Sequence, residues 1–324
     1  MPTDAPIPVT LVSGFLGAGK TTLIQRMLSA RPDLKFAVIE NEFGAASIDH
    51  ALLAHEAEVV EINDGCVCCS VRGDLIRILG DLARQRDAGA ARFDHVLIET
   101  TGLADPAPVI QTFFVDPLIH ARYRLDAMLV VIDAEYGMTQ LDGHAAAREQ
   151  VAYADALLVG KRDRTSDAAA SALLQRLARI NPRAPAYTMT HANIDVARLL
   201  DLKAFNLSTL LQLDPDFLHD SHAHHHDDIT AFVYRNARAF DEARLEDFMA
   251  RMIAEHHRKL LRYKGILNLA GESERVALQG VHMTVYGDRI GPWPKDAPRA
   301  STLVFIGRQL PEAALRAGLD ACLI

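Results

Sequence analysis

Short apolar runs alternate with longer amphipathic stretches between residues 9 and 190 of the chain. Each apolar run is followed by glycine or polar residues, which is the pattern of a buried strand. The predicted strands are 9–12, 36–40, 59–62, 96–98, 127–133, 156–159 and 186–190. Apolar residues at helical spacing predict helices that begin at residue 23 and that cover 71–88, 106–114 and 168–180. This alternation predicts an α/β fold with a mainly parallel sheet, covered by helices on both faces.

The pattern changes after a polar segment that contains a run of histidines. Beyond this segment the predicted strands lie close together in the sequence, at 229–234, 265–269, 276–278, 281–285 and 303–307, with helices over 242–256 and from Pro311. Strands that cluster in this way predict a smaller α+β domain. We therefore expect a first domain over 1–212, a linker over 213–228 and a C-terminal domain over 229–324.

Charge and composition narrow the classes of function. The net charge is −8 and there is no basic block. Nucleic acid is therefore not expected as the main partner, because such binding depends on neutralising phosphates. No apolar run has the length of a membrane span, and the first seven residues, with Asp4 and two prolines, do not form a signal peptide. We expect a cytoplasmic protein that does not bind a membrane.

A glycine-rich segment, GFLGAGKTT at 14–22, follows the first predicted strand and precedes a helix. Strand, glycine-rich loop, lysine, hydroxyl and helix form the arrangement of a P-loop NTPase. Backbone N–H groups of the loop and the helix dipole favour a polyphosphate. We expect Lys20 to reach the β- and γ-phosphates and the Thr21 hydroxyl to bind Mg²⁺. The predicted phosphate-binding set is Gly17, Ala18, Gly19, Lys20, Thr21 and Thr22.

Two more polar segments follow predicted strands, so they should lie at the same edge of the sheet as the P-loop. Glu99 can hold a magnesium water, and the N–H of Gly102 can meet a γ-phosphate. Lys161 and Asp163 form a K-x-D pattern. Asp163 can accept hydrogen bonds from both N1–H and N2–H of guanine, and the stem of Lys161 can lie along the base. We therefore expect a guanine nucleotide, with Lys20 and Glu99 acting in catalysis.

Three of the four cysteines lie within four positions: Cys66, Cys68 and Cys69. In a reducing compartment such a cluster is more typical of a metal site than of a disulfide. Three thiolates suit Zn²⁺, and Co²⁺ or Ni²⁺ stays open as an alternative. The histidine run offers a second, weaker set of metal ligands, and a plain polar linker is an equal alternative. Its candidate ligands are His224, His225 and His226.

Two other groups are expected to be structural. Cys322, near the end of the chain, is interpreted as a small core residue. Residues 256–259 and Arg262 are predicted to form a solvated basic face of the helix over 242–256.

Together these motifs resemble the CobW-type P-loop GTPases, metallochaperones of the SIMIBI class, and are most similar to the YjiA branch of that family. The motifs that carry the resemblance are GFLGAGKTT at 14–22, VIENEFG at 38–44, NDGCVCC at 63–69, IETTGLADP at 98–106, KRD at 161–163, LLRYKGIL at 260–267 and LVFIGRQL at 303–310. The resemblance implies Mg²⁺-dependent GTP hydrolysis, binding of zinc, cobalt or a similar ion at the CxCC motif, and delivery of that metal to a client protein. It also implies a metal role for Glu40.

The chain departs from the family pattern at two positions. Many members have N-K-x-D as the base motif, whereas this chain has Gly160 in place of the asparagine, which removes one contact to the base. Many members also have a glutamate after ENEFG, where this chain has Ala45. If that carboxylate binds metal or contacts a switch, this chain lacks the contact.

The order of the motifs suggests a GTP-gated metal carrier. The CxCC motif lies in sequence between the ENEFG and ETTG segments, both of which can sense a γ-phosphate. Neither a water-positioning glutamine nor an arginine finger can be assigned, so we expect slow intrinsic turnover. Two alternatives from other classes remain: a P-loop small-molecule kinase, and a metal store or sensor that is not an enzyme. The oligomeric state and the client protein stay open.

Overall fold

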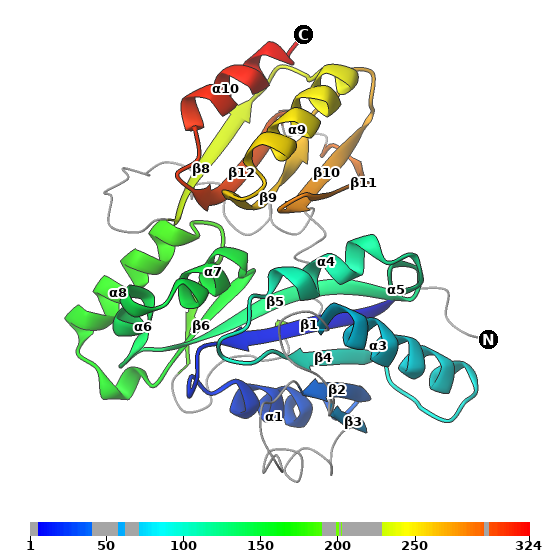
Figure 1. Ribbon diagram of the computed structural model, residues 1–324, viewed down its shortest axis with the longest axis vertical. Coiled ribbons are helices and arrows are strands. Elements are labelled where there is room, and N and C mark those ends of the chain that lie inside the picture. The colour runs from blue at the N-terminus through cyan, green and yellow to red at the C-terminus, as the bar shows by residue number, and fades with distance from the viewer. Residues whose placement is uncertain are drawn as a thin grey trace. The chain divides into compact units, whose positions relative to one another are not determined.

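The computed structural model describes residues 6–40, 58–61, 71–189, 199–200, 202, 229–294 and 298–324 (Figure 1). These residues form two compact units, the first mainly of residues up to 202 and the second of residues from 229 on. The expected order, an α/β domain and then a smaller α+β domain, is confirmed. The boundaries predicted for the linker, 213 and 228, lie outside the described residues and stay predictions.

The first unit contains a seven-stranded sheet in the order β3-β2-β4-β1-β5-β6-β7. Every strand pair in it is parallel, as the alternation of strands and helices predicts. The strands are β1 (Ile7–Gly14), β2 (Phe36–Glu40), β3 (Glu58–Glu61), β4 (His95–Glu99), β5 (Tyr123–Asp133), β6 (Ala156–Gly160) and β7 (Ala186–Thr188).

The middle of this sheet is buried on both faces. All residues of β4 and β6 are buried, so side chains on both sides of these strands are covered. β1 lies between β4 and β5, and Leu11 is paired with Ile98 on one side and Met128 on the other. Because the strands are parallel, the segments after β1, β4, β5 and β6 leave the sheet at the same edge.

The helices of this unit surround the sheet (Figure 1). They are α1 (Lys20–Ala30), α3 (Val71–Asp87), α4 (Ala107–Val115), α5 (Pro117–Arg122), α6 (Gly137–Gly143), α7 (Ala145–Tyr153) and α8 (Asp167–Ile180), with a short 3₁₀ turn, η1 (Arg162–Arg164). The hydrophobic pattern did not predict α5, α6 or α7. These helices are too short to display a clear periodicity; α5 is defined instead by its cap, because the Asp116 carboxylate accepts hydrogen bonds from the N–H groups of Leu118 and Ile119.

The second unit is an antiparallel sheet in the order β11-β10-β9-β12-β8, with two helices on one face. Its elements are β8 (Ile229–Asn236), α9 (Glu242–His256), β9 (Leu260–Leu267), β10 (Glu274–Val281), β11 (Thr284–Pro292), β12 (Ser301–Arg308) and α10 (Glu312–Ala321). Phe240, Phe305 and Leu319 are fully buried in the core between the helices and the sheet.

Two expectations for this unit are wrong. The strand predicted over 281–285 contains the hairpin turn between β10 and β11, where His282 has a φ of 50°. Arg262 is not on the solvated face of a helix: it lies in β9 and is 2% exposed. The chain reverses directly after α9, where the N–H of Lys259 donates to the carbonyl of His256 (2.8 Å), and the next strand begins five residues earlier than its apolar pattern indicates.

Within the described ranges, every helix is too short or too polar to pass through a bilayer.

Candidate nucleotide site

The P-loop wraps tightly at the end of β1 because three glycines take backbone conformations that other residues avoid. Gly14, Gly17 and Gly19 have φ angles of 141°, 74° and 103°. A side chain at Gly14 would meet the carbonyl oxygen of Val131 at 2.3 Å. The N–H of Ala18 closes the loop by donating to the carbonyl of Phe15 (3.2 Å). The loop leads into the N-terminus of α1, whose first turn has no acidic residue, so the local field favours an anion.

Lys20, Thr21 and Glu99 meet beside this loop, although 78 residues separate the last two. The Thr21 hydroxyl donates to both oxygens of the Glu99 carboxylate, at 3.3 and 3.2 Å. The Lys20 ammonium lies 4.0 Å from Glu99 Oε1, and both side chains are about nine-tenths buried. The structure therefore brings together the lysine, hydroxyl and carboxylate that the sequence predicts. Thr22 is exposed on α1.

This group of side chains fits a hydrated magnesium ion. Mg²⁺ prefers oxygen ligands and keeps several of its waters, which a threonine hydroxyl and a carboxylate can hold. Two more buried hydroxyls, those of Ser13 and Thr100, have no hydrogen-bond partner among the described residues. They belong to the residues directly before Gly14 and directly after Glu99. Buried polar atoms are rarely left without a partner, so these two hydroxyls indicate water or ligand oxygens at this place.

The segment after Glu99 packs directly on the P-loop. A side chain added at Gly102 would lie 2.5 Å from the backbone nitrogen of Leu16, so only glycine permits this approach. The amide of Gln150, on α7, donates to the carbonyls of Gly102 (3.1 Å) and Ala104 (3.3 Å). The sequence analysis missed Gln150, because its position, about 50 residues downstream on an unpredicted helix, carries no local signal.

Lys161 joins the P-loop to the end of β5. Its ammonium donates to the carbonyl of Gly17 and to the carboxylate of Asp133, both at 2.7 Å. Asp133 is 2% exposed and also accepts a hydrogen bond from the N–H of Glu135 (2.9 Å). The sequence analysis gave Asp133 no role, although an aspartate after the most apolar strand could have indicated one.

The two other positions of the predicted base motif, Gly160 and Asp163, differ in their surroundings. Asp163 lies in η1, the turn that follows β6 in the chain, and is exposed. At Gly160 an added Cβ would lie 3.2 Å from the terminal methyl of Met189. A larger residue at 160, such as the asparagine of the family pattern, would therefore require the flexible Met189 side chain to move.

The expected metal ligands fall mostly outside the described residues. Cys66, Cys68, Cys69, His224, His225 and His226 all belong to that part of the chain. Among the residues that the structure describes, no three histidine, cysteine or carboxylate side chains gather around a possible ion. The backbone of Glu40 is described: it ends β2, paired with Glu99 of β4 and with Glu61 of β3. The segment with the three cysteines begins directly after Glu61.

Cys322 is a structural residue, as expected. It is buried, and its thiol donates to the carbonyl of Gly318 (3.2 Å). Burial raises the pKa of this thiol above its ordinary value, which keeps it protonated and unreactive at neutral pH.

Comparison with known proteins finds nucleotide-binding relatives for both parts of the chain. The model of the CobW/HypB/UreG nucleotide-binding domain matches residues 8–188, and that of the cobalamin synthesis protein cobW C-terminal domain matches residues 229–323. The chain is 41% identical to the zinc chaperone YjiA of Escherichia coli, over 96% of this chain and 97% of that protein. It is 33% identical to the zinc-regulated GTPase metalloprotein activator 1 of Schizosaccharomyces pombe, over 68% of this chain and 59% of that protein.

A solved structure covers both units. The crystal structure of Zn(II)-bound YjiA GTPase from Escherichia coli aligns over 99% of this chain and 100% of that one, with a TM-score of 0.79 and 37% identity. The first family model spans more than half of the chain, and the relative with 41% identity aligns over nearly all of it. The chain is therefore a member of the CobW/HypB/UreG family of nucleotide-binding proteins.

Proposed function

We propose that this chain is a GTPase that carries zinc and delivers it to a client protein under the control of the bound nucleotide. The observation that carries the proposal is the buried group of Lys20, Thr21 and Glu99 beside an intact P-loop. The names of its relatives, zinc chaperone and zinc-regulated GTPase metalloprotein activator, support the same proposal.

In this proposal the P-loop binds the phosphates of GTP through backbone N–H groups and Lys20. Thr21 and Glu99 hold Mg²⁺, which offsets the negative charge that develops on the phosphates during hydrolysis. Gly102 packs closely on Leu16 of this loop, and its N–H is the proposed donor to the γ-phosphate. Ser13 and Thr100 supply the two buried hydroxyls that are available to water or phosphate oxygens.

Guanine is the proposed base. Asp163 is exposed and available to accept hydrogen bonds from N1–H and N2–H, which adenine cannot offer. Lys161 is fixed by Gly17 and Asp133, so its stem is ordered before a nucleotide arrives. Preorganisation of this kind reduces the entropy that binding must overcome.

Zinc is the proposed cargo, held by the thiolates of Cys66, Cys68 and Cys69 with Glu40 as a further ligand. Three thiolates leave one position of a tetrahedral Zn²⁺ open, which suits an ion that must be handed on. A reducing compartment such as the cytoplasm would keep these thiols available. None of these residues identifies the client protein.

Coupling between the two sites is supported by the register of the sheet. Glu61, which precedes the cysteine segment, is paired with Glu40, and Glu40 is paired with Glu99 beside the P-loop. Three neighbouring strands, β3, β2 and β4, therefore connect the segment that carries the proposed zinc ligands to the proposed magnesium site. Bound GTP would order the segments after these strands and complete the zinc site, and hydrolysis would release that order.

The test is a zinc titration against a competing chelator, without nucleotide, with GDP and with a non-hydrolysable GTP analogue. We expect zinc affinity to differ between the nucleotide states by about 5- to 150-fold, the usual range of allosteric coupling. Zinc must then change GTP affinity by the same factor. Lys20→Ala should remove the nucleotide effect and leave zinc binding intact, whereas serine at Cys66, Cys68 and Cys69 should abolish zinc binding.

Equal zinc affinity in all three states would contradict the gated carrier and favour a store or sensor. Loss of zinc after mutation of His224, His225 and His226, but not after mutation of the cysteines, would move the metal site to the histidine run.

A further inference from the structure

The segment that joins β4 to α4, residues 100–106, is neither helix nor strand, so contacts from outside the segment set its conformation. The amide group of Gln150 supplies two of these contacts. It donates to the carbonyl of Gly102 at 3.1 Å and to the carbonyl of Ala104 at 3.3 Å. No other donor in the part of the chain that the structure describes bonds to these two carbonyls. Gln150 is therefore the anchor of the middle of this segment.

Burial and chemistry both suit Gln150 to this task. It lies on α7 and is 1% exposed, so water does not compete for its amide group. A neutral amide carries two N–H donors on one nitrogen, which matches two carbonyl acceptors. An ionised carboxylate could only accept hydrogen bonds and would repel both carbonyl oxygens, and an apolar side chain would leave them without a partner. Replacement of Gln150 should therefore release the segment.

One of the anchored carbonyls belongs to the residue that meets the P-loop. Gly102 is buried, and a Cβ added to it would lie 2.5 Å from the backbone nitrogen of Leu16. Glycine has a permissive backbone, so the orientation of its peptide groups depends on the contacts around it. Leu16 on one side and Gln150 on the other limit this freedom. They therefore also limit the direction of the Gly102 N–H, the proposed donor to the γ-phosphate.

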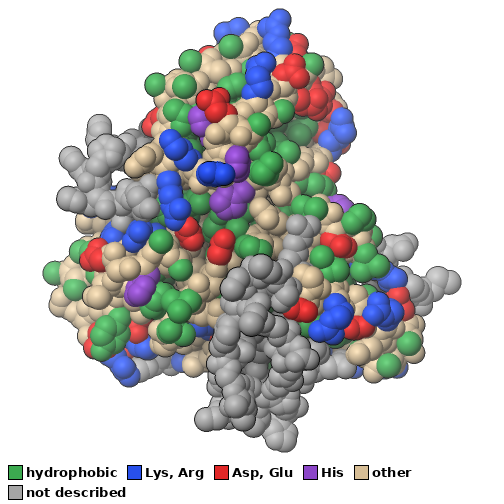
Figure 2. All heavy atoms as spheres, viewed as in Figure 1, with side chains coloured by type: hydrophobic (Ala, Val, Ile, Leu, Met, Phe, Trp, Pro, Cys, Tyr) green, Lys and Arg blue, Asp and Glu red, His purple; other side chains and the backbone are tan. Residues whose placement is uncertain are grey.

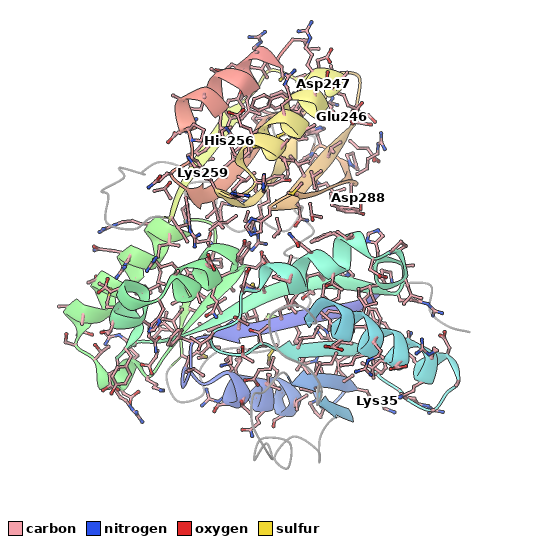
Figure 3. All side chains as sticks on the ribbon, viewed as in Figure 1. Lys35, Glu246, Asp247, His256, Lys259 and Asp288 are labelled. Carbon is pink, nitrogen blue, oxygen red and sulfur yellow. The ribbon has the colours of Figure 1, made fainter. Side chains whose placement is uncertain are left out.

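The helix that carries Gln150 is itself attached to the nucleotide-binding edge of the sheet. α7 packs on β1 and β5, and Figure 3 shows its side chains between the helix and the strands. The ring of His144, directly before α7, has its centroid 4.6 Å from that of Phe15 in the P-loop. Figure 2 shows apolar and charged side chains on the surface over α6 and α7, whereas Gln150 is buried. α7 thus contacts both the P-loop and the segment after β4.

We propose that Gln150 is a positioning residue for the γ-phosphate of GTP, because it holds Gly102 so that the N–H of this glycine meets that phosphate. The inference rests on the proposed function and adds to it a residue that distinguishes GTP from GDP. GDP has no γ-phosphate, so the contact through Gly102 is made only with GTP and with the transition state of its hydrolysis. Loss of the Gln150 amide should therefore weaken GTP binding and leave GDP binding unchanged.

The test is isothermal titration of the full chain, with Mg²⁺ and with either GDP or a non-hydrolysable GTP analogue. Gln150→Met keeps the length of the side chain and removes both donors. We expect affinity for the analogue to fall at least about tenfold, because a hydrogen bond to a charged group is weakened, and affinity for GDP to change less than about twofold. The kcat/KM for GTP hydrolysis should fall by at least the same factor as the affinity for the analogue.

Two further variants make the test specific. Gln150→Glu keeps the size of the side chain, so it serves where the methionine variant does not fold. Its ionised carboxylate cannot donate, and we expect the same selective loss. Gln140→Met is the matched control, since it makes the same substitution on α6, where the side chain has no hydrogen bond to any described residue. Both nucleotides should bind to this control within about twofold of wild type.

Equal weakening of GDP and of the analogue would overturn the proposal, because it would indicate a general structural role for Gln150. Unchanged binding of both nucleotides in both Gln150 variants would overturn it as well. The wild type tests the proposed function separately. A wild-type chain that neither binds nor hydrolyses GTP would contradict both proposals, whereas an active wild type with indistinguishable Gln150 variants would contradict only the role of Gln150.

Discussion

At the scale of single residues, function depends on a few close approaches that admit no other side chain. Gly102 touches the P-loop where a Cβ would lie 2.5 Å from a backbone nitrogen. Lys161 bridges Gly17 and Asp133 across the end of the sheet. These contacts hold the P-loop, the segment after β4 and the turn that is proposed to bind the base in one arrangement, so small changes here should affect nucleotide binding more than stability.

Gly102→Ala should weaken GTP binding by at least about tenfold. The added methyl group would push the backbone of Leu16 and distort the loop that holds the phosphates, and a misplaced binding group loses much of its effect. Isothermal titration with a non-hydrolysable GTP analogue measures the change. Gly143→Ala is the control, because a Cβ at Gly143 meets nothing within 4 Å. Unchanged affinity in Gly102→Ala would show that the contact with Leu16 has no role in binding.

Cys322 should resist alkylation in the native protein at pH 8. Its pKa is raised by burial, so the thiolate, which is the reactive species, is scarcer than in an exposed cysteine at the same pH. Mass spectrometry after treatment with iodoacetamide would follow the peptide that contains Cys322, and the same treatment in urea gives the fully labelled reference. Native labelling as fast as labelling in urea would contradict the buried, protonated thiol.

At the scale of elements, caps and turns decide where the C-terminal helices and strands begin. α9 begins after Asp241, whose carboxylate accepts a hydrogen bond from the N–H of Arg244 (3.0 Å). The pattern of apolar residues predicts the same boundaries for this helix, because cap and periodicity agree there. The apolar pattern fails at β9. This strand begins at Leu260 and contains two charged residues, Arg262 and Lys264, that are buried in the sheet.

Asp241→Ala should lower the free energy of unfolding of the second unit by about 1 kcal/mol, since it removes a side-chain cap. Urea denaturation followed by circular dichroism measures the loss. Asp247→Ala is the matched control, since Asp247 lies within the same helix, is exposed and caps no backbone group. Equal stability of the two variants would mean that solvent replaces the cap at no cost.

At the scale of the whole molecule, we expect the binding of nucleotide and magnesium to be linked to the stability of the folded state. A ligand that binds only the folded state stabilises it, by about 2.7 kcal/mol at a concentration 100 times its Kd. The direct contact between Thr21 and Glu99 means that part of this stabilisation belongs to the magnesium ion that these residues are proposed to hold. Removal of the ion should therefore be visible in the stability of the entire nucleotide-binding unit.

Thermal unfolding with GDP should show a higher midpoint in the presence of Mg²⁺ than with EDTA. In Thr21→Val the difference between the two conditions should disappear, because the hydroxyl ligand is lost while the side-chain volume is kept. A variant that retains the full effect of Mg²⁺ would exclude Thr21 as a ligand. Differential scanning calorimetry of wild type and variant, at equal nucleotide concentration, provides the comparison.

The amino-acid sequence by itself determined the parallel strands and longer helices of the first unit, the P-loop and the residues that follow each parallel strand. These features depend on local pattern, since a buried strand must be apolar and a phosphate loop must contain glycine. The convergence of Lys20, Thr21 and Glu99 also followed from the sequence, because the ends of parallel strands share one edge. The family resemblance rested on the same local motifs.

Only the tertiary structure decided the contacts between residues that are far apart in the chain. The ion pair of Lys161 with Asp133, the support of Gly102 by Gln150 and the apolar groove beside α9 all join segments with no common local signal. Arg262 is a further example. It is buried because it lies inside a sheet, which its charged neighbours in the sequence do not indicate. Local periodicity reports which face of an element is buried, whereas packing decides what that face meets.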